Sequence, residues 1–238
     1  MDDARLLDTL TVAFLNDPLY RWLYPDAKTR PAAVEANLRL TLSLVRERGH
    51  VETDRDGTAV ALWTTPGVQL LTDPAPFLEL LDRWASDRVA AALAGMAACG
   101  AHAEPSDAVL HVLAVHPSRQ GRGLAAQLLA ATLHELDRQG TSSYLESSNA
   151  RNLSFYQRAG FRPLAEVVVP EGGPSMYPLR RHAAGGRQEG PKTGPPSGSG
   201  TRTTTQPPPP TPRRGSPTST THGPPERATC TLPDEDQP

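Results

Sequence analysis

A glycine-rich turn is the most chemically informative feature of the sequence. An apolar, strand-like segment at residues 109–115 is followed by a loop and then by a turn that opens a helix, with the residues Gln120, Gly121, Arg122, Gly123, Leu124 and Ala125. The first N–H groups of a helix have no intrahelical partner, and the helix dipole places partial positive charge at that end. The turn therefore predicts a binding site for a phosphate-bearing ligand.

The same turn has two other interpretations. Gly121-x-Gly123-x-x-Ala126 also satisfies the dinucleotide-binding fingerprint, and Glu146 follows it at about the separation in sequence expected for a ribose-binding acid. That fingerprint has its first glycine directly after a strand, whereas residues 116–120 intervene here, so we disfavour it. The glycines can also be purely structural, as a turn and a helix start.

A second pattern, Asn152-x-x-x-Tyr156-x-x-x-Gly160-Phe161, lies downstream. Gln120-x-x-Gly123-x-Ala125 resembles the pyrophosphate-binding motif of the GNAT N-acetyltransferases, and the downstream pattern is similar to the second signature of that superfamily. Residues 144–156, 167–172 and 61–66 are similar to its puromycin N-acetyltransferase-like branch. The resemblance is specific over residues 109–181.

The resemblance implies an α/β fold of three layers with a splayed central mixed sheet, and acetyl-CoA as co-substrate. It implies cofactor contacts from the backbone of Leu113, Ala114 and Val115, supplementary charge from Arg119 or Arg122, and contact of Asn152 with the cofactor arm. Members of this superfamily normally have a strand before the first helix. Here the helical periodicity starts at Leu6, so either the given start is late or the first strand is missing.

Tyr156 and Glu146 are the predicted catalytic residues. A phenol, with a pKa of about 10, is protonated at neutral pH and suits a leaving thiol with a pKa of about 8.5–10. The acceptor amine must lose a proton before it attacks, and Glu146, near the end of its strand, is the leading base, directly or through water. The alternatives are a packed helix aromatic and a solvated carboxylate. His111 and His116 are expected to be structural.

The expected elements alternate between helices and strands. Helices are predicted at residues 6–14, 31–49, 77–93, 123–139 and 152–159, and strands near residues 51 and 60 and at 109–115, 142–147, 161–169 and 175–180. Asp56-Gly57 predicts a hairpin between the first two strands. One central strand–helix–strand unit among hairpins indicates a mixed sheet.

Composition divides the chain near residue 182. Residues 183–238 hold more than half of the 25 prolines and none of the Phe, Trp or Tyr residues. Such a segment buries too little apolar surface to offset the entropy of ordering. We expect a folded domain at 1–182 and a disordered tail at 183–238.

Charge, hydropathy and cysteine positions indicate which partners and which cellular compartment to expect. The net charge is -2, and no basic face indicates nucleic acid. No apolar run is long enough to cross a bilayer, and the acidic start is unlike a signal peptide, so no membrane association and a cytoplasmic location are expected. Cys99 and Cys230 fall in different parts of the chain, so neither a disulfide nor a metal site is expected.

Three functions remain open. The first expectation is an acetyl-CoA-dependent N-acetyltransferase, a monomer or homodimer, that acts on a primary amine of a small, antibiotic-like molecule. The alternatives are a protein or peptide N-acetyltransferase of the same fold and a catalytically silent acyl-CoA-binding protein. Four aromatic residues are candidates for the acceptor pocket, with core packing as the safer description: Tyr20, Trp22, Tyr24 and Trp63.

Overall fold

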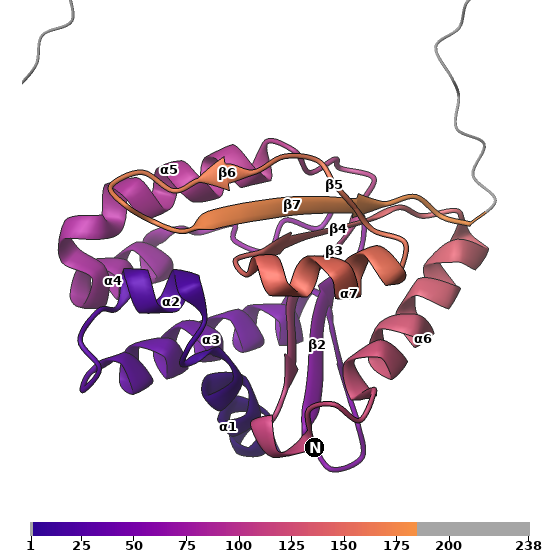
Figure 1. The fold of residues 1–238 in the computed structure, drawn as a ribbon, viewed down its shortest axis with the longest axis horizontal. Helices are drawn as coiled ribbons and strands as arrows, with labels where there is room; N and C mark the ends of the chain where they lie inside the picture. The colour runs from indigo at the N-terminus through magenta and orange to yellow at the C-terminus, as the bar shows by residue number, and fades with distance from the viewer. Residues whose placement is uncertain (1, 185–238) are drawn as a thin grey trace, which may run out of the picture. The chain divides into compact units, whose positions relative to one another are not determined.

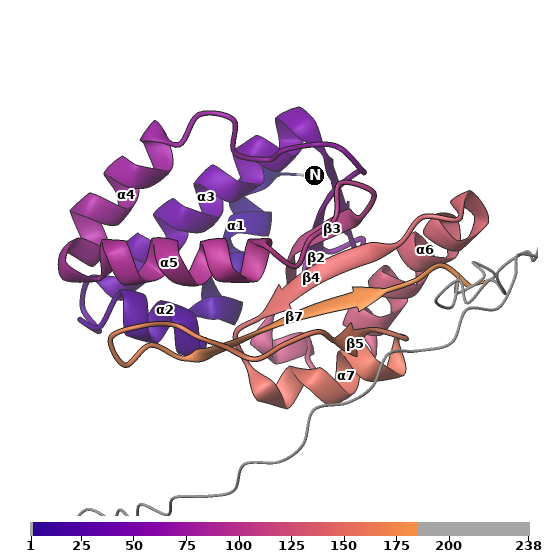
Figure 2. The ribbon, with the colours of Figure 1, turned by 90° about the horizontal axis from the view of Figure 1, so that it is seen from above.

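Two layers of helices enclose a mixed β-sheet and position the candidate site (Figure 1). The computed structural model describes residues 2–184. Figure 2 shows α1–α5 on one side of the sheet and α6 and α7 on the other. The helices are α1 (Asp3–Phe14), α2 (Pro18–Leu23), α3 (Arg30–Arg48), α4 (Ala75–Ala85), α5 (Val89–Gly100), α6 (Leu124–Gln139) and α7 (Leu153–Arg158).

The sheet is antiparallel except at its centre. Its strands lie in the order β1-β2-β3-β4-β7-β5, and β6 pairs with β7 off this path. Only β3 and β4 are parallel among the described strands, because α6 connects them. The strands are β1 (His50–Thr53), β2 (Ala59–Thr64), β3 (Ala108–Val115), β4 (Ser143–Ser147), β5 (Arg162–Pro163), β6 (Val167–Val168) and β7 (Ser175–Arg181).

Strand alternation divides the core into two main clusters, one on each face of the sheet. Val60 and Leu62 pack with α1 and α3, whereas Ala61 and Trp63 pack with α6 and α7. All four of these side chains are fully buried. Because successive strand residues point to opposite faces, the side chains of β2 pack against both layers of helices.

Local sequence signals explain several boundaries. Asp17 accepts a hydrogen bond from the backbone N–H of Leu19 and caps α2, which has Pro18 in its first turn. At the end of α3, a Cβ on Gly49 would lie 2.0 Å from the carbonyl oxygen of Trp63, so only glycine fits there. The predicted stop of this helix at residue 49 is confirmed.

Two predicted elements were wrong. Residues 77–93 do not form one helix, because a 3-10 turn at Ser86–Arg88 separates α4, which packs on α3, from α5, which packs on β6 and β7. A continuous strand at 161–169 is also absent. Between β5 and β6, Leu164 donates its N–H to the carbonyl oxygen of Pro178 on β7, but Pro178 has no N–H to donate back, and regular pairing with β7 is interrupted at residues 164–166.

The predicted tail falls almost wholly outside the described residues, which end at residue 184. The last two described residues still pack on the fold. Ala183 is buried, and the backbone N–H of Ala184 donates a 2.7 Å hydrogen bond to Asp137 Oδ1. None of the helices in residues 2–184 has the length and apolar character needed to span a bilayer.

Candidate active site

An opening between β3 and β4 lies at the centre of the candidate site. The two strands pair only as far as Leu110 and Leu145, although β3 continues to Val115 alongside β2. The register between β2 and β3 passes from Leu110 to Val112 and skips His111, which marks a β-bulge there. The bulge interrupts the regular alternation of β3 side chains between the two faces of the sheet at His111. The pairing of β3 with β4 stops at the residue before it.

Beyond this opening, one edge of β3 lacks a strand partner. Leu113, Ala114 and Val115 pair with β2 on one side and, within residues 2–184, with no strand on the other. An unpaired strand edge presents N–H and C=O groups that can bind an extended chain of amides. Because alternate residues of an antiparallel strand bond to the neighbouring strand, only part of the backbone of these three residues points to the open edge, and one such group, the Val115 carbonyl, accepts a hydrogen bond from the Gln120 side chain.

The glycine-rich turn has the geometry of an anion cradle. Gly121 and Gly123 have φ values of 75° and 79°, in the left-handed region that glycine adopts without a steric cost. Gly123 occupies the N-cap position of α6 and makes no side-chain capping bond. In the described structure, the N–H groups of Leu124 and Ala125 have no acceptor. Free donors at the start of a 16-residue helix suit a phosphate.

The side chains around the turn differ in how firmly they are held. Gln120 donates a 3.1 Å hydrogen bond to the carbonyl oxygen of Val115 and fixes the turn to the end of β3. Arg119 lies 3.2 Å from Asp56 in an exposed ion pair, whereas Arg122 forms no ion pair within residues 2–184. Asn152 is exposed at the N-cap of α7. Arg122 is thus the more available supplementary charge.

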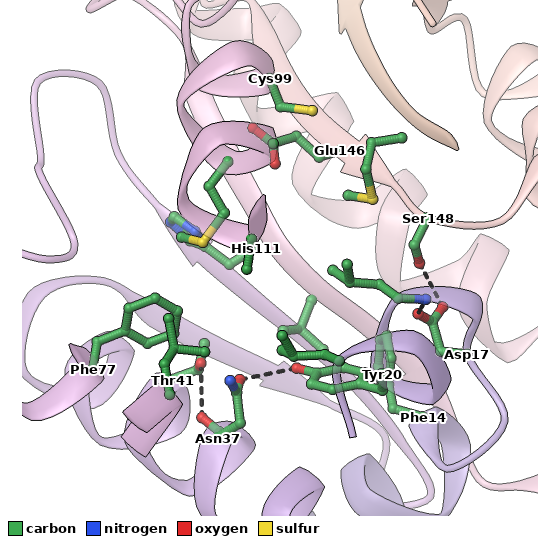
Figure 3. Close-up of a pocket in the computed structure, with 18 of the residues that line it drawn as sticks. Phe14, Asp17, Tyr20, Asn37, Thr41, Phe77, Cys99, His111, Glu146 and Ser148 are labelled. Atoms are coloured by element: carbon green, nitrogen blue, oxygen red, sulfur yellow. Dashed lines mark hydrogen bonds between the residues drawn. The ribbon is translucent and has the colours of Figure 1, made fainter. Parts of the chain in front are cut away.

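A cavity of about 290 Å³ lies on the other face of the sheet, among helices α1–α5 (Figure 3). His111 and Glu146 both line it, and they are the residues that directly follow the last β3–β4 pair. The cavity therefore begins at the opening between the two strands. Its other polar lining residues are Asp17, Tyr20, Asn37, Thr41 and Ser148.

Glu146 and His111 have opposite electrostatic properties. The surface of Glu146 is open to the cavity, but the protein around it still removes much of its hydration, which raises the pKa of the carboxyl. Burial lowers the pKa of His111 to about 4, so this ring is neutral at pH 7. Its Nε2 lies 2.9 Å from Thr64 Oγ1. Of the two groups, Glu146 is the stronger base.

Tyr156 is nearly buried on α7 and does not line the cavity. Its ring packs edge-on against Phe155 and Phe161. Burial, and then the charge of Asp17, raise the pKa of its phenol to about 12, so the hydroxyl is protonated at neutral pH. Tyr156 therefore lies within electrostatic reach of Asp17, which does line the cavity.

Sequence reasoning missed Asp17 as a site residue and treated His111 as structural. Asp17 Oδ2 accepts a 2.5 Å hydrogen bond from Ser148, which follows β4, and burial raises the pKa of its carboxyl. The Asp17-Pro18 pair does signal a helix start, but nothing in the sequence places it beside Ser148. Of the four candidate aromatic residues, only Tyr20 lines the cavity, and Trp63 is fully buried in the core.

Several proteins to which this chain is similar are described as acetyltransferases. The acetyltransferase (GNAT) family model matches residues 45–161. The crystal structure of histone acetyltransferase HPA2 and related acetyltransferase from Corynebacterium glutamicum has a TM-score of 0.51 at 24% identity, over 76% of this chain and 91% of that chain. Arylalkylamine N-acetyltransferase 2 from Aedes aegypti has a TM-score of 0.51 at 14% identity, over 76% and 94% of the two chains.

The protein has the GNAT fold, and the residues that the GNAT family model matches make up just under half of the chain. A sequence relative is the mycothiol acetyltransferase of Clavibacter michiganensis, which is 40% identical over 99 residues. That match covers 39% of this chain and 29% of the relative, so it spans less than a third of the relative's length. A cluster of His, Cys, Asp or Glu side chains able to hold a metal ion is absent from the described residues.

Proposed function

We propose that the protein transfers the acetyl group of acetyl-CoA to the primary amine of a small molecule. The observation that carries this proposal is the opening between β3 and β4. It joins a strand edge and a phosphate-binding turn to a cavity that begins at Glu146 and His111. A donor held outside the opening can thus meet an acceptor held inside the cavity.

Acetyl-CoA supplies a reactive thioester on an amide-bearing arm that ends in phosphates. The free N–H groups of the turn at Gly121–Ala125 suit the phosphates, and the unpaired edge of Leu113–Val115 suits the amides. An N–H on that edge can also polarise the thioester carbonyl. The residues present therefore fit this co-substrate.

Two side chains handle the protons. Glu146 accepts the proton that the attacking amine loses, directly or through water, because its raised pKa makes it a better base than an ordinary surface carboxylate. Tyr156 Oη donates a proton to the leaving sulfur, since burial keeps the phenol protonated. The N–C bond forms and the C–S bond breaks, while Glu146 takes the proton that the amine loses and Tyr156 supplies the proton of the free thiol.

The size of the cavity favours a small molecule over a folded protein substrate. At about 290 Å³ it is near the lower end of small-molecule sites, which start at about 300 Å³. The similarity of residues 144–156 to the puromycin N-acetyltransferase-like branch supports the same class of acceptor.

Release of free thiol from acetyl-CoA tests the proposal. The full chain is incubated with acetyl-CoA and a panel of primary amines, and the rate is compared with that in the absence of amine. We expect amine-dependent thiol release for at least one member and acetylated product by mass spectrometry. Acetyl-CoA binding without amine-dependent release from any member would support the silent binding protein instead.

A further inference from the structure

The lining of the cavity indicates the chemical class of the acceptor, an inference that rests on the proposed function. We infer that the acceptor is an amphipathic monoamine, with an apolar body and no anionic group, whose nitrogen lies at the Glu146 end of the cavity. Three properties of the lining carry this inference. They are its apolar walls, its lack of a cation and the distribution of its unpaired polar atoms.

The walls are mainly hydrocarbon and come from helices on one face of the sheet. α4 and α5, inserted between β2 and β3, form much of them together with α3. Met96 is 45% exposed and adds a flexible thioether. Apolar surface of this kind stabilises an aromatic or aliphatic body by removing it from water. The apolar side chains include Leu40, Leu44, Leu70, Leu71, Phe77, Leu81 and Met96.

Most polar groups on the walls already bond to one another (Figure 3). Tyr20 donates to Asn37 Oδ1 over 2.9 Å, and Thr41 donates to the carbonyl oxygen of Asn37 over 3.0 Å. Ser148 donates to Asp17. These bonds use the hydroxyl donors of the walls, so few donors remain for the hydroxyls of a sugar, and a hydroxyl buried without its partners is unfavourable.

The unpaired polar atoms gather where the strands separate. Tyr144 Oη lies 3.1 Å from Glu146 Oε1 but shares its single proton with the nearer carbonyl oxygen of Cys99, at 2.7 Å, while Glu146 Oε2 has no partner in residues 2–184. His111 is likewise bonded through Nε2 alone, which leaves Nδ1 free in the same part of the chain. A carboxylate oxygen and a neutral ring nitrogen that both lack a partner, on two residues that both line the cavity, suit an ammonium or amine nitrogen.

The charges on the lining exclude anions. Two carboxylates, Asp17 and Glu146, face the cavity, and its lining residues within the described chain include no lysine or arginine. Burying an acceptor carboxylate or phosphate without a cation is strongly unfavourable. An amine that also carries an acid is therefore disfavoured against the same amine without one.

A matched pair of acceptors tests this inference. Phenylethylamine and phenylalanine share a ring and an amine and differ by one carboxylate. We expect kcat/KM for phenylethylamine to be about 100-fold higher, since an unpaired buried charge costs several kcal/mol. Glucosamine and a peptide with an N-terminal methionine serve as polyhydroxylated and peptidic probes, and both should be poorer acceptors than phenylethylamine.

A charge placed on the wall should shift this preference. Leu40 is half-buried, so the Leu40→Arg variant can keep its guanidinium near water when the cavity is empty. We expect it to reduce the preference for phenylethylamine over phenylalanine about tenfold, because it supplies the missing cation. Leu40→Met, similar in length but neutral, should leave the preference unchanged, and equal melting temperatures would show that both variants fold.

The outcomes separate the inference from the function that it rests on. Faster turnover of phenylalanine or glucosamine than of phenylethylamine would overturn the amphipathic class while leaving acetyl transfer intact. Faster turnover of the peptide would overturn it in favour of a protein substrate. If the protein binds acetyl-CoA but none of the four probes causes release of thiol, the inference would be overturned and the result would count against the proposed function.

Discussion

The two sides of the β3–β4 opening are built in different ways. The turn side consists of backbone N–H groups from one continuous stretch, Gly121–Ala125, at the start of α6. The cavity side consists of side chains from distant segments, such as Asp17 and Ser148, which are 131 residues apart and hydrogen-bonded. Backbone donors are the same for every residue except proline, whereas each side chain on the cavity wall contributes its own shape and charge.

This difference implies that the two binding steps are separable. Substitutions in the turn should change the affinity for acetyl-CoA without altering which amine is preferred. Substitutions on the cavity wall should do the reverse. Tyr156 is nearly buried on α7, and the charge of Asp17 raises the pKa of its phenol. Tyr156 lines neither the turn nor the cavity, so its substitution should affect the chemical step alone.

The largest expected effect is on the turn side. Gly123→Glu adds a carboxylate where a phosphate is expected, at a φ of 79° that side chains rarely adopt. Lost charge-assisted hydrogen bonds, worth about 1.5–3 kcal/mol, together with charge repulsion should weaken acetyl-CoA binding about 1,000-fold by calorimetry. Nothing lies within 4 Å of the added Cβ, so the variant should still fold.

Gly123→Gln is the matched control for that variant. It has nearly the same size and the same backbone strain but no charge, so its loss of affinity should be clearly smaller. Equal losses for the two variants would mean that the turn binds no anion and that its glycines are structural. Tight binding of NADH by the parent protein would instead revive the dinucleotide interpretation.

The next largest effect should come from Tyr156→Phe. The ring still packs on Phe155 and Phe161, but the phenol is lost, so kcat should fall about 100-fold while acetyl-CoA binding and melting temperature stay nearly constant. Tyr177→Phe makes the same chemical change at a hydroxyl that bonds only to Glu166 in the described residues, and should leave kcat unchanged. An unchanged kcat in Tyr156→Phe would make Tyr156 a packing residue.

The same contrast explains how far the sequence could predict the site. The turn, α6 and the strands β3 and β4 follow from local periodicity and from glycines in a short segment, and the structure has them at the predicted positions. The opening between β3 and β4 was expected only through resemblance to a family. No local signal marks the bulge at His111, because it depends on pairing with β2.

The cavity could not be predicted for a related reason. Its lining comes from eight helices and strands and the loops between them, and which of their side chains meet depends on how the helices pack. Asp17 was recognisable as a helix cap, but its contact with Ser148 is a tertiary event. Likewise, the break between α4 and α5 follows from their different packing partners rather than from helix propensity.

A smaller effect is expected from Glu146→Gln. The amide keeps the shape but accepts no proton, and we expect kcat/KM at neutral pH to fall about 30-fold, less than a typical general-base loss of about 100-fold, because neutral His111 can still orient the amine. The loss should shrink at alkaline pH, where more of the acceptor is already deprotonated. Asp17→Asn removes the other carboxylate of the cavity but leaves Glu146 in place, so it should keep the fall in kcat/KM toward acid that Glu146 causes.

The pH profile itself distinguishes a base from a positioning residue. The folded protein raises the pKa of Glu146, so in the parent the carboxylate becomes protonated, and kcat/KM falls, as the pH drops through that raised value. Protonation of the acceptor amine lowers kcat/KM toward acid in both proteins, so in Glu146→Gln that fall should remain while the additional, steeper fall below the pKa of Glu146 disappears. A variant that still shows the additional fall would exclude Glu146 as the base.

The smallest effect should come from shortening the chain. A protein ending at Ala184 removes none of the described packing, so turnover and melting temperature should match those of the full chain. Ending at His182 also removes buried Ala183 and the hydrogen bond from the Ala184 N–H to Asp137. That loss, about 1 kcal/mol, should lower the melting temperature by about 2–4 °C without changing kcat, because both contacts lie at the end of α6 remote from its N-terminal turn. If ending at Ala184 abolished acetyl-CoA binding, the later residues would belong to the site, and the expectation of a dispensable tail would be wrong.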